Sequence, residues 1–323
     1  MSTVAVGCKV RVTAVNNEAE GIKSFELSPV DATPLPAFTA GAHVDLYLQN
    51  DLTRSYSLIN PQGELHRYVV AINRDEASRG GSVFIHDSLR VGSELIVGAP
   101  RNNFPLVEDA GHIVFIAGGI GITPLWCMIQ RLEAIGQPWT LYYSARNRKN
   151  AAFLGALLQL AEKHKGRVHL NFDREPGGRM LDLAAIVATQ PADAHFYCCG
   201  PVPMLEAFER ACAERPAENV HVEYFSAKAD AAADIGGFEV VLAKSGRRLA
   251  VPVGESILNT LLENDIDAPY SCTEGVCGAC KTSVIEGVPD HRDHVLTEAE
   301  QQTNQLVMIC CSGSRTPSLV IDL

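Results

Sequence analysis

The chain has 323 residues, of which 46% are hydrophobic, so it can form two or three domains with packed cores. Its formal net charge of −11 argues against binding to nucleic acids or to anionic membranes. No apolar run reaches the length of a membrane span, and residues 1–15 alternate like a strand rather than forming an export signal. We therefore expect a soluble, cytoplasmic protein.

The first part of the chain, residues 1–107, is predicted to consist mainly of β-strands. Its short segments alternate or are continuously apolar, and clusters of Pro, Gly and Asn separate them. This pattern is typical of a small antiparallel barrel or sandwich. The expected strands are residues 10–15, 43–48, 68–72 and 94–97.

In residues 108–226 the pattern changes to buried strands that alternate with helices. Continuous apolar runs such as residues 113–117 are expected where both faces of a strand are covered. The alternation predicts an α/β domain with a doubly wound parallel sheet. The expected strands are residues 113–117, 139–144, 168–172 and 195–199, and the expected helices are residues 124–134, 153–163, 182–189 and one near Met204.

A linker is expected at residues 227–237, which are rich in Ala, Asp and Gly and have no apolar face. The third part, residues 238–323, contains strand and helix signals around a cysteine-rich loop. Its expected elements are a hairpin of residues 238–242 and 248–251, a helix of residues 256–263 and a buried strand of residues 306–312.

Two segments of the first part have the residue types that bind a phosphate group and a planar ring. One is a strand with a cation, hydroxyls and an aromatic ring, and the other is a glycine-rich helix start, whose free amides attract anions. A tyrosine on a strand is most often a packing residue, so these segments alone leave flavin binding open. The candidate residues are Arg54, Ser55, Tyr56 and Ser57 in the strand, and Arg79, Gly80, Gly81 and Ser82 at the helix start.

A second glycine-rich turn follows the first predicted strand of the α/β part. Glycines at this position let the backbone approach a pyrophosphate, and Thr123 can cap the following helix. A tight strand–helix turn in any α/β fold is the alternative, but a Cys-Gly-Pro turn ends another strand of the same sheet, and ligands collect at the carboxyl ends of such strands. The residues are Gly118, Gly119, Gly121, Thr123 and Pro124 in the first turn, and Cys199, Gly200 and Pro201 in the second.

Four cysteines, Cys272, Cys277, Cys280 and Cys310, have the spacing of ligands to an iron–sulfur cluster. They form C-x4-C-x2-C with a fourth cysteine after twenty-nine further residues, the plant-type pattern for [2Fe–2S]. Cys311 is expected on the opposite face of the predicted strand. The alternatives are zinc, which usually takes two Cys-x2-Cys pairs where this chain has one, and disulfides, which the lack of an export signal disfavours.

The last third of the chain is the most acidic. From residue 229 onward, fourteen Asp and Glu residues stand against six Lys and Arg, a net charge of −8. These charges can keep the protein soluble, or they can form a docking face around the cluster for a basic partner. The sequence leaves both interpretations open.

The motifs at residues 54–57, 80–82, 118–124, 199–201 and 272–280 together resemble one family over the whole chain. They resemble, in this order, the phthalate dioxygenase reductase family of iron–sulfur flavoproteins, within the ferredoxin–NADP reductase superfamily. The segments around Phe225 and Asp293 are also similar to that family. The resemblance implies an FMN-binding antiparallel barrel at 1–107, an NAD-binding α/β domain at 108–226 and a β-grasp-type plant ferredoxin domain at 238–323.

The resemblance also implies a mechanism. Hydride passes from NADH to FMN, and electrons leave one at a time through the [2Fe–2S] cluster to an external acceptor. Arg54 and the turn at Gly80, Gly81 and Ser82 are expected to hold the FMN phosphate. The remaining expected roles are Tyr56 and Ser57 at the flavin ring, Phe225 covering that ring, and Thr123 and Cys199 in the nicotinamide pocket.

Cofactor choice depends on residues that follow the predicted strands. Asp173 can bond the adenosine ribose hydroxyls and repel a 2′-phosphate, which favours NADH. Arg146 and Arg148 oppose this, because a cation beside the ribose accommodates NADPH. We expect NADH to be preferred.

The leading functional hypothesis is a reductase component that feeds a terminal Rieske-type oxygenase acting on an aromatic or similar small acid. The alternative is a reductase for a haem monooxygenase or another redox partner. A passive ferredoxin-type carrier is the third possibility, and the flavin and NAD signals argue against it. We expect a monomer that docks its partner near the acidic ferredoxin domain.

Overall fold

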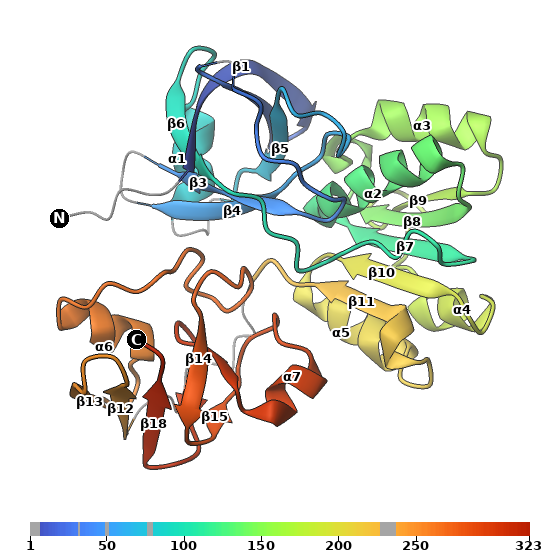
Figure 1. Ribbon diagram of the computed structural model, residues 1–323. Helices are drawn as coiled ribbons and strands as arrows, with labels where there is room; N and C mark the ends of the chain where they lie inside the picture. The colour runs from blue at the N-terminus through green and yellow to red at the C-terminus, as the bar shows by residue number, and fades with distance from the viewer. Residues whose placement is uncertain (1–6, 32, 49–51, 76–79, 227–236) are drawn as a thin grey trace. The chain divides into compact units, whose positions relative to one another are not determined.

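The computed structural model describes residues 7–31, 33–48, 52–75, 80–226 and 237–323 (Figure 1). They fall into two compact units, one ending at Tyr224 and the other beginning at Phe225. Within these ranges, no helix is long and apolar enough to cross a membrane. The predicted linker lies almost entirely outside the described residues, as does Arg79.

The first unit begins with a six-stranded antiparallel sheet in the order β4-β3-β6-β1-β2-β5. A bridge between Leu58 and Val70 joins its two ends, so the sheet closes as a barrel. This agrees with the predicted antiparallel domain, although the sequence analysis missed β2. The elements are β1 (Gly7–Ala19), β2 (Ile22–Pro29), β3 (His43–Tyr47), β4 (Thr53–Ser57), β5 (Tyr68–Asn73), α1 (Gly81–Ser88) and β6 (Glu94–Gly98).

The same unit continues with a parallel five-stranded sheet in the order β11-β10-β7-β8-β9, the predicted doubly wound fold. Helices α2 and α3 lie on one side of it and α4 and α5 on the other (Figure 1). Both faces of β7 are thus covered, and its residues 113–117 are fully buried. The elements are β7 (Ile113–Gly118), α2 (Ile122–Ile135), β8 (Trp139–Ala145), α3 (Leu154–Lys163), β9 (Val168–Phe172), α4 (Leu183–Ala188), β10 (His195–Cys199), α5 (Val202–Ala211) and β11 (Val220–Glu223).

The barrel and the parallel sheet share one continuous hydrophobic core. The Tyr197 hydroxyl accepts a hydrogen bond from the backbone N–H of Val107 (2.8 Å) and donates to the carbonyl of Pro105 (3.2 Å). On the other side, the thiol of Cys127 in α2 donates to the carbonyl of Asn60 in the barrel (3.2 Å). The two sequence-predicted domains are therefore packed as one body.

The second unit has its own core and a mixed sheet in the order β13-β12-β18-β14-β16. The central pair β12 and β18 is parallel and its neighbours are antiparallel, which is the β-grasp arrangement that was expected. The elements are β12 (Phe238–Leu242), β13 (Arg248–Val251), α6 (Ile257–Glu263), β14 (Lys281–Glu286), β15 (Pro289–Asp290), α7 (Glu298–Thr303), β16 (Leu306–Met308), β17 (Gly313–Ser314) and β18 (Ser318–Ile321).

The predicted strand at residues 306–312 is wrong in its second half. Strand β16 ends at Met308, whose carbonyl accepts hydrogen bonds from the backbone N–H groups of Cys311 (3.2 Å) and Ser312 (3.0 Å). These bonds close a turn, so Cys310 and Cys311 are not on opposite faces of a strand. An apolar run alone does not reveal a tight turn of this kind.

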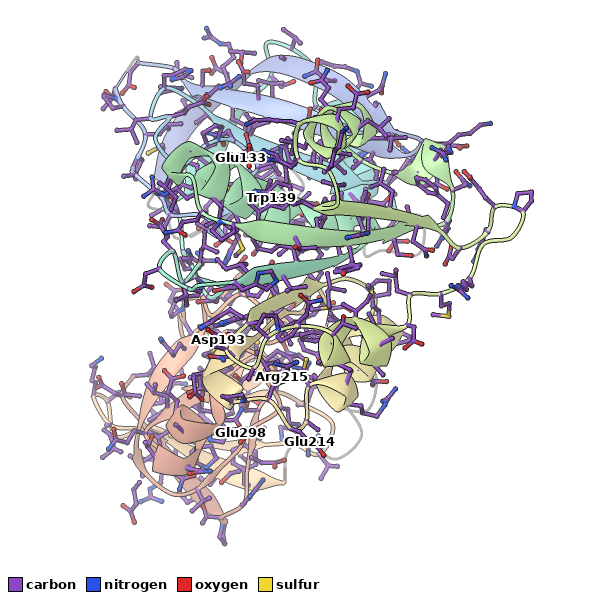
Figure 2. The ribbon with its side chains drawn as sticks, turned by 90° about the vertical axis from the view of Figure 1, so that its right-hand side faces the viewer. Glu133, Trp139, Asp193, Glu214, Arg215 and Glu298 are labelled. Atoms are coloured by element: carbon purple, nitrogen blue, oxygen red, sulfur yellow. The ribbon has the colours of Figure 1, made fainter. Side chains whose placement is uncertain are left out.

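A polar network joins α2, β8 and the end of α3. The carboxylate of Glu133 accepts hydrogen bonds from Trp139 Nε1 (2.9 Å), Lys163 Nζ (2.7 Å) and His164 Nε2 (2.8 Å). Figure 2 shows Glu133 next to Trp139. Burial raises the pKa of Glu133, but the Lys163 and His164 donors outweigh it and lower the pKa to about 2.

Glu133→Gln is expected to lower the Tm of the first unit by about 2–6 °C at pH 7, because it removes charge-assisted hydrogen bonds. The folded-state pKa lies below the ordinary 4.5, so this stabilisation is complete above about pH 5 and is lost as the pH falls toward 2. The fluorescence of Trp126 and Trp139 reports unfolding. The exposed Glu162 provides the control Glu162→Gln; an equal loss in both variants, or a loss that is as large at pH 3 as at pH 7, would contradict the assignment.

Candidate functional site

Arg54 lies over the start of helix α1. A methyl group at Gly81 would come within 2.6 Å of Arg54 Nε, so the arginine side chain packs directly against the helix backbone. Gly80, which precedes the helix, has the left-handed φ of 84° that glycine adopts readily. The guanidinium and the free N–H groups of the first helical turn thus meet at one place, which suits the binding of a phosphate.

The serines around this place are held by the protein itself. Ser82 Oγ accepts a hydrogen bond from the backbone N–H of Asp75 (3.2 Å), and Ser55 Oγ donates to Asp45 Oδ1 (2.7 Å). Asp45 is buried and paired with Arg101 through both carboxylate oxygens. These bonds fix the strand and the helix start relative to the rest of the barrel.

Tyr56 lies two residues after Arg54 in β4, on the same face of the strand. Its ring is partly buried against the core, and burial raises the pKa of its phenol. Ser57, on the other face, is buried. Arg54, which can bind a phosphate, and Tyr56, which can contact a planar ring, therefore lie side by side on β4. FMN contains both of these groups.

The two glycine turns of the parallel sheet meet at the carboxyl ends of β7 and β10. A methyl group at Gly121 would lie 2.2 Å from the carbonyl oxygen of Cys199, so the backbones touch there. Gly118 packs in the same way against Pro201, and Gly200 against Gly118. This edge, at the start of α2, suits the close approach of a dinucleotide pyrophosphate.

Thr123 does not cap helix α2, contrary to the sequence-based expectation. The helix begins at Ile122 after Gly121, and no side chain caps it. The Thr123 hydroxyl instead donates to the carbonyl of Ile120 (2.9 Å) and is almost fully buried. It stabilises the glycine turn from inside, and Pro124 follows it within the first helical turn.

Cys199 and Glu223 are neighbours at the ends of β10 and β11. Cys199 is fully buried, and burial raises the pKa of its thiol. Glu223 Oε2 is shielded from solvent without a hydrogen-bond partner among the described residues, and burial raises the pKa of this carboxyl to about 8. The sequence analysis did not name Glu223 as a site residue. The signal that could have identified it is a carboxylate within the strand-like run of residues 220–224.

The remaining predicted residues of the nucleotide site lie where their strands end. Backbone bonds from Asp173 to Ala145 (3.1 Å) and from Arg174 to Arg146 (2.9 Å) tie the loops after β8 and β9 together. Phe225 follows β11 directly at the start of the second unit, and 40% of its surface is exposed. Its expected role over the flavin ring stays a prediction.

The four predicted cluster ligands converge in the second unit and are nearly buried. The thiol of Cys272 lies within hydrogen-bonding reach of Cys277 and of Cys310, and the thiol of Cys280 within reach of Cys310. Backbone N–H groups point at the sulfurs: Glu274 N lies 3.3 Å from Cys272 Sγ. Such hydrogen bonds stabilise thiolates and tune a bound cluster.

This arrangement fits a [2Fe–2S] cluster. The thiol contacts join Cys272 with Cys277 and Cys310, and Cys280 with Cys310, so the four sulfurs gather at one place as the ligands of a plant-type cluster must. All ten cysteines are free thiols, so disulfides are absent.

Comparisons with known proteins agree with this geometry. The family model for the 2Fe-2S iron-sulfur cluster binding domain matches residues 240–314, and that for the oxidoreductase NAD-binding domain matches residues 115–210. The chain is 52% identical over 314 residues to the phenoxybenzoate dioxygenase subunit beta of Ectopseudomonas oleovorans, which covers 97% of each chain.

Two solved structures resemble the whole chain. Phthalate dioxygenase reductase superposes with a TM-score of 0.73 at 34% identity over 98% of both chains. An intact type IV self-sufficient cytochrome P450 monooxygenase superposes with a TM-score of 0.87 at 37% identity over 98% of this chain, which spans only 41% of that longer chain. The predicted fold class and the predicted cluster and nucleotide cofactors are confirmed.

Cys310→Ser is expected to abolish cluster retention, whereas Cys311→Ser is expected to preserve it. Cys310 contacts the candidate ligands Cys272 and Cys280, whereas the Cys311 thiol contacts Cys310 and donates to the carbonyl of Met308 (3.8 Å). Iron and acid-labile sulfide analysis of both purified variants distinguishes them. Full iron content in Cys310→Ser, or loss of iron only in Cys311→Ser, would reverse the assignment.

Proposed function

The chain belongs to the phthalate dioxygenase reductase family, and we propose that it passes electrons from NADH through FMN and its [2Fe–2S] cluster to a terminal Rieske-type oxygenase. The observation that carries the proposal is the occurrence of three candidate sites on one chain. They are the Arg54 and α1 cradle, the paired glycine turns, and the four converging cysteines. FMN, when bound, supplies the conversion of a two-electron donor into single electrons.

The chain's own residues position the reactants. Arg54 and the first turn of α1 would hold the FMN phosphate, and Tyr56 would contact the flavin ring, with Ser57 near the polar edge of that ring. The glycine turns at Gly118 and Gly200 admit the NADH pyrophosphate.

Glu223 and Cys199 border the end of the nucleotide site. With a pKa of about 8, Glu223 is mostly protonated at neutral pH and can donate a hydrogen bond from a buried position. Cys199 stays a neutral thiol and fills space beside it. The two residues exclude water and offer one polar group at the place where the nicotinamide ring is expected.

The oxygenase partner is proposed to be of the Rieske type, acting on an aromatic or similar small acid. A relative that is 52% identical over 97% of this chain is named as a dioxygenase subunit. Phthalate dioxygenase reductase matches over 98% of both chains, whereas this chain spans 41% of the P450 monooxygenase chain. A monomer in the cytoplasm, where NADH is available, is part of the proposal.

The acidic third part of the chain is proposed to be the docking face. A net charge of −8 over residues 229–323 attracts a basic surface and speeds encounter. The exposed Tyr270, two residues before Cys272, lies beside the cluster loop. An electron can leave there without passing through the first unit.

With NADH and an isolated Rieske dioxygenase under anaerobic conditions, the protein is expected to reduce the Rieske cluster. The rate should fall severalfold between about 50 and 300 mM salt, because screening weakens an electrostatic encounter. Stopped-flow absorbance of the oxygenase measures both effects, and Cys310→Ser serves as the inactive control. Rapid reduction of a cytochrome P450 with no reduction of any Rieske protein would favour the haem alternative.

Arg54→Ala is expected to weaken FMN binding about 10- to 100-fold, because one charge-assisted phosphate contact is lost. Fluorescence titration of the flavin-free protein measures the Kd. Arg11→Ala removes an exposed cation from the same barrel and should leave the Kd unchanged. Equal affinities in the wild type and in Arg54→Ala would remove Arg54 from the phosphate site.

A further inference from the structure

In the loops after β8 and β9, the side chain of Arg148 is already engaged by an aromatic ring and by a carboxylate of the protein itself. The guanidinium of Arg148 lies 4.7 Å from the centre of the Phe172 ring, and its Nε is 3.4 Å from Glu175 Oε2. The backbone N–H of Arg148 also donates to Glu175 Oε1 (2.8 Å). Both carboxylate oxygens of Glu175 are therefore directed at one residue.

Glu175 is held in place by its own turn. Its backbone N–H donates to the carbonyl of Phe172 (3.3 Å), and its carbonyl accepts from Gly178 (2.7 Å). The same turn carries Asp173, whose backbone is tied to Ala145. Glu175 and Asp173 thus belong to one fixed segment at the carboxyl end of β9.

Asp173 supplies an unsatisfied acceptor in this segment. Its Oδ1 is buried and has no hydrogen-bond partner among the described residues. A buried carboxylate oxygen without a donor is costly, and a ribose hydroxyl satisfies it. A 2′-phosphate at that hydroxyl would instead meet a negative charge.

The ion pair between Arg148 and Glu175 contributes little to stability. The side chains are 61% and 32% exposed, and exposed pairs contribute about 0–1 kcal/mol. The ion pair matters more for the local charge, because Glu175 neutralises the positive charge of Arg148 next to the proposed ribose site. Arg174 and Arg146 lie at the same edge, where the backbone N–H of Arg174 donates to the carbonyl of Arg146 (2.9 Å).

We propose that Glu175 determines the preference for NADH by holding Arg148 in this pair, away from a 2′-phosphate. The proposal rests on the proposed function, because it assigns the adenosine ribose to the edge formed by β8 and β9. To bind a 2′-phosphate, Arg148 has to leave both Glu175 and the Phe172 ring. The carboxylate of Glu175 then remains beside the phosphate and repels it.

The test measures adenosine binding without flavin or cluster chemistry. Isothermal calorimetry gives the Kd of the purified full chain for 5′-AMP and for 2′,5′-ADP, which differ by the 2′-phosphate. The variants are Glu175→Gln, Arg148→Met and the double variant. Glu214→Gln is the matched control, since Glu214 (Figure 2) is exposed and lies beyond the end of α5, which leads away from the carboxyl edge of the sheet.

Glu175→Gln is expected to improve 2′,5′-ADP binding relative to 5′-AMP about tenfold, the effect of one released charge-assisted contact. The double variant should lose this gain, and Glu214→Gln should match the wild type. An unchanged ratio in Glu175→Gln, or a gain that survives in the double variant, overturns the role of Arg148 and leaves the proposed function intact. A wild type that binds neither nucleotide overturns the nucleotide site itself.

Discussion

The packing of helix α2 and strand β10 against the barrel is the constraint on which the rest of the first unit depends. Hydride transfer needs its donor and acceptor held within a few ångströms of each other, and most of the catalytic gain from such positioning requires rigid support. The buried ring of Tyr197 supplies part of that support through its contact with Phe104 and its hydrogen bonds to the connecting segment. The thiol of Cys127 fastens α2 to the barrel from the other side.

The two units divide the chemistry. The first unit holds the Arg54 and α1 cradle and the paired glycine turns on one core, which is where the proposed function assigns the two-electron step. The second unit has a separate core and supplies the one-electron centre. Its cluster loop is organised by backbone N–H groups directed at sulfur, a feature that sets the potential of a bound cluster.

Patterns that depend on local physics were predictable from sequence. The run of residues 113–117 is apolar because β7 is covered on both faces, and the four cysteines are recognisable because cluster geometry restricts their spacing. Both are properties of neighbouring residues along the chain, so one sequence contains the signal. The family resemblance then assigned these local motifs to three domains in a defined order along the chain.

What the sequence missed depends on tertiary contacts. The turn at Cys310 interrupts an apolar run, and its hydrogen bonds to the Met308 carbonyl leave no mark in composition. Glu223 becomes significant only because burial raises its pKa beside Cys199. The pairing of Arg148 with Glu175 requires two loops that are twenty-seven residues apart in sequence to meet at one edge of the sheet.

The central claim is that hydride entry and single-electron exit occur on this one chain. An anaerobic titration of the purified protein with NADH, followed by visible absorbance and by electron paramagnetic resonance, tests it most directly. The account predicts bleaching of a flavin band together with loss of the oxidised cluster absorbance and the appearance of a reduced [2Fe–2S] signal. A colourless protein, or a coloured one whose spectrum NADH leaves unchanged, would contradict it.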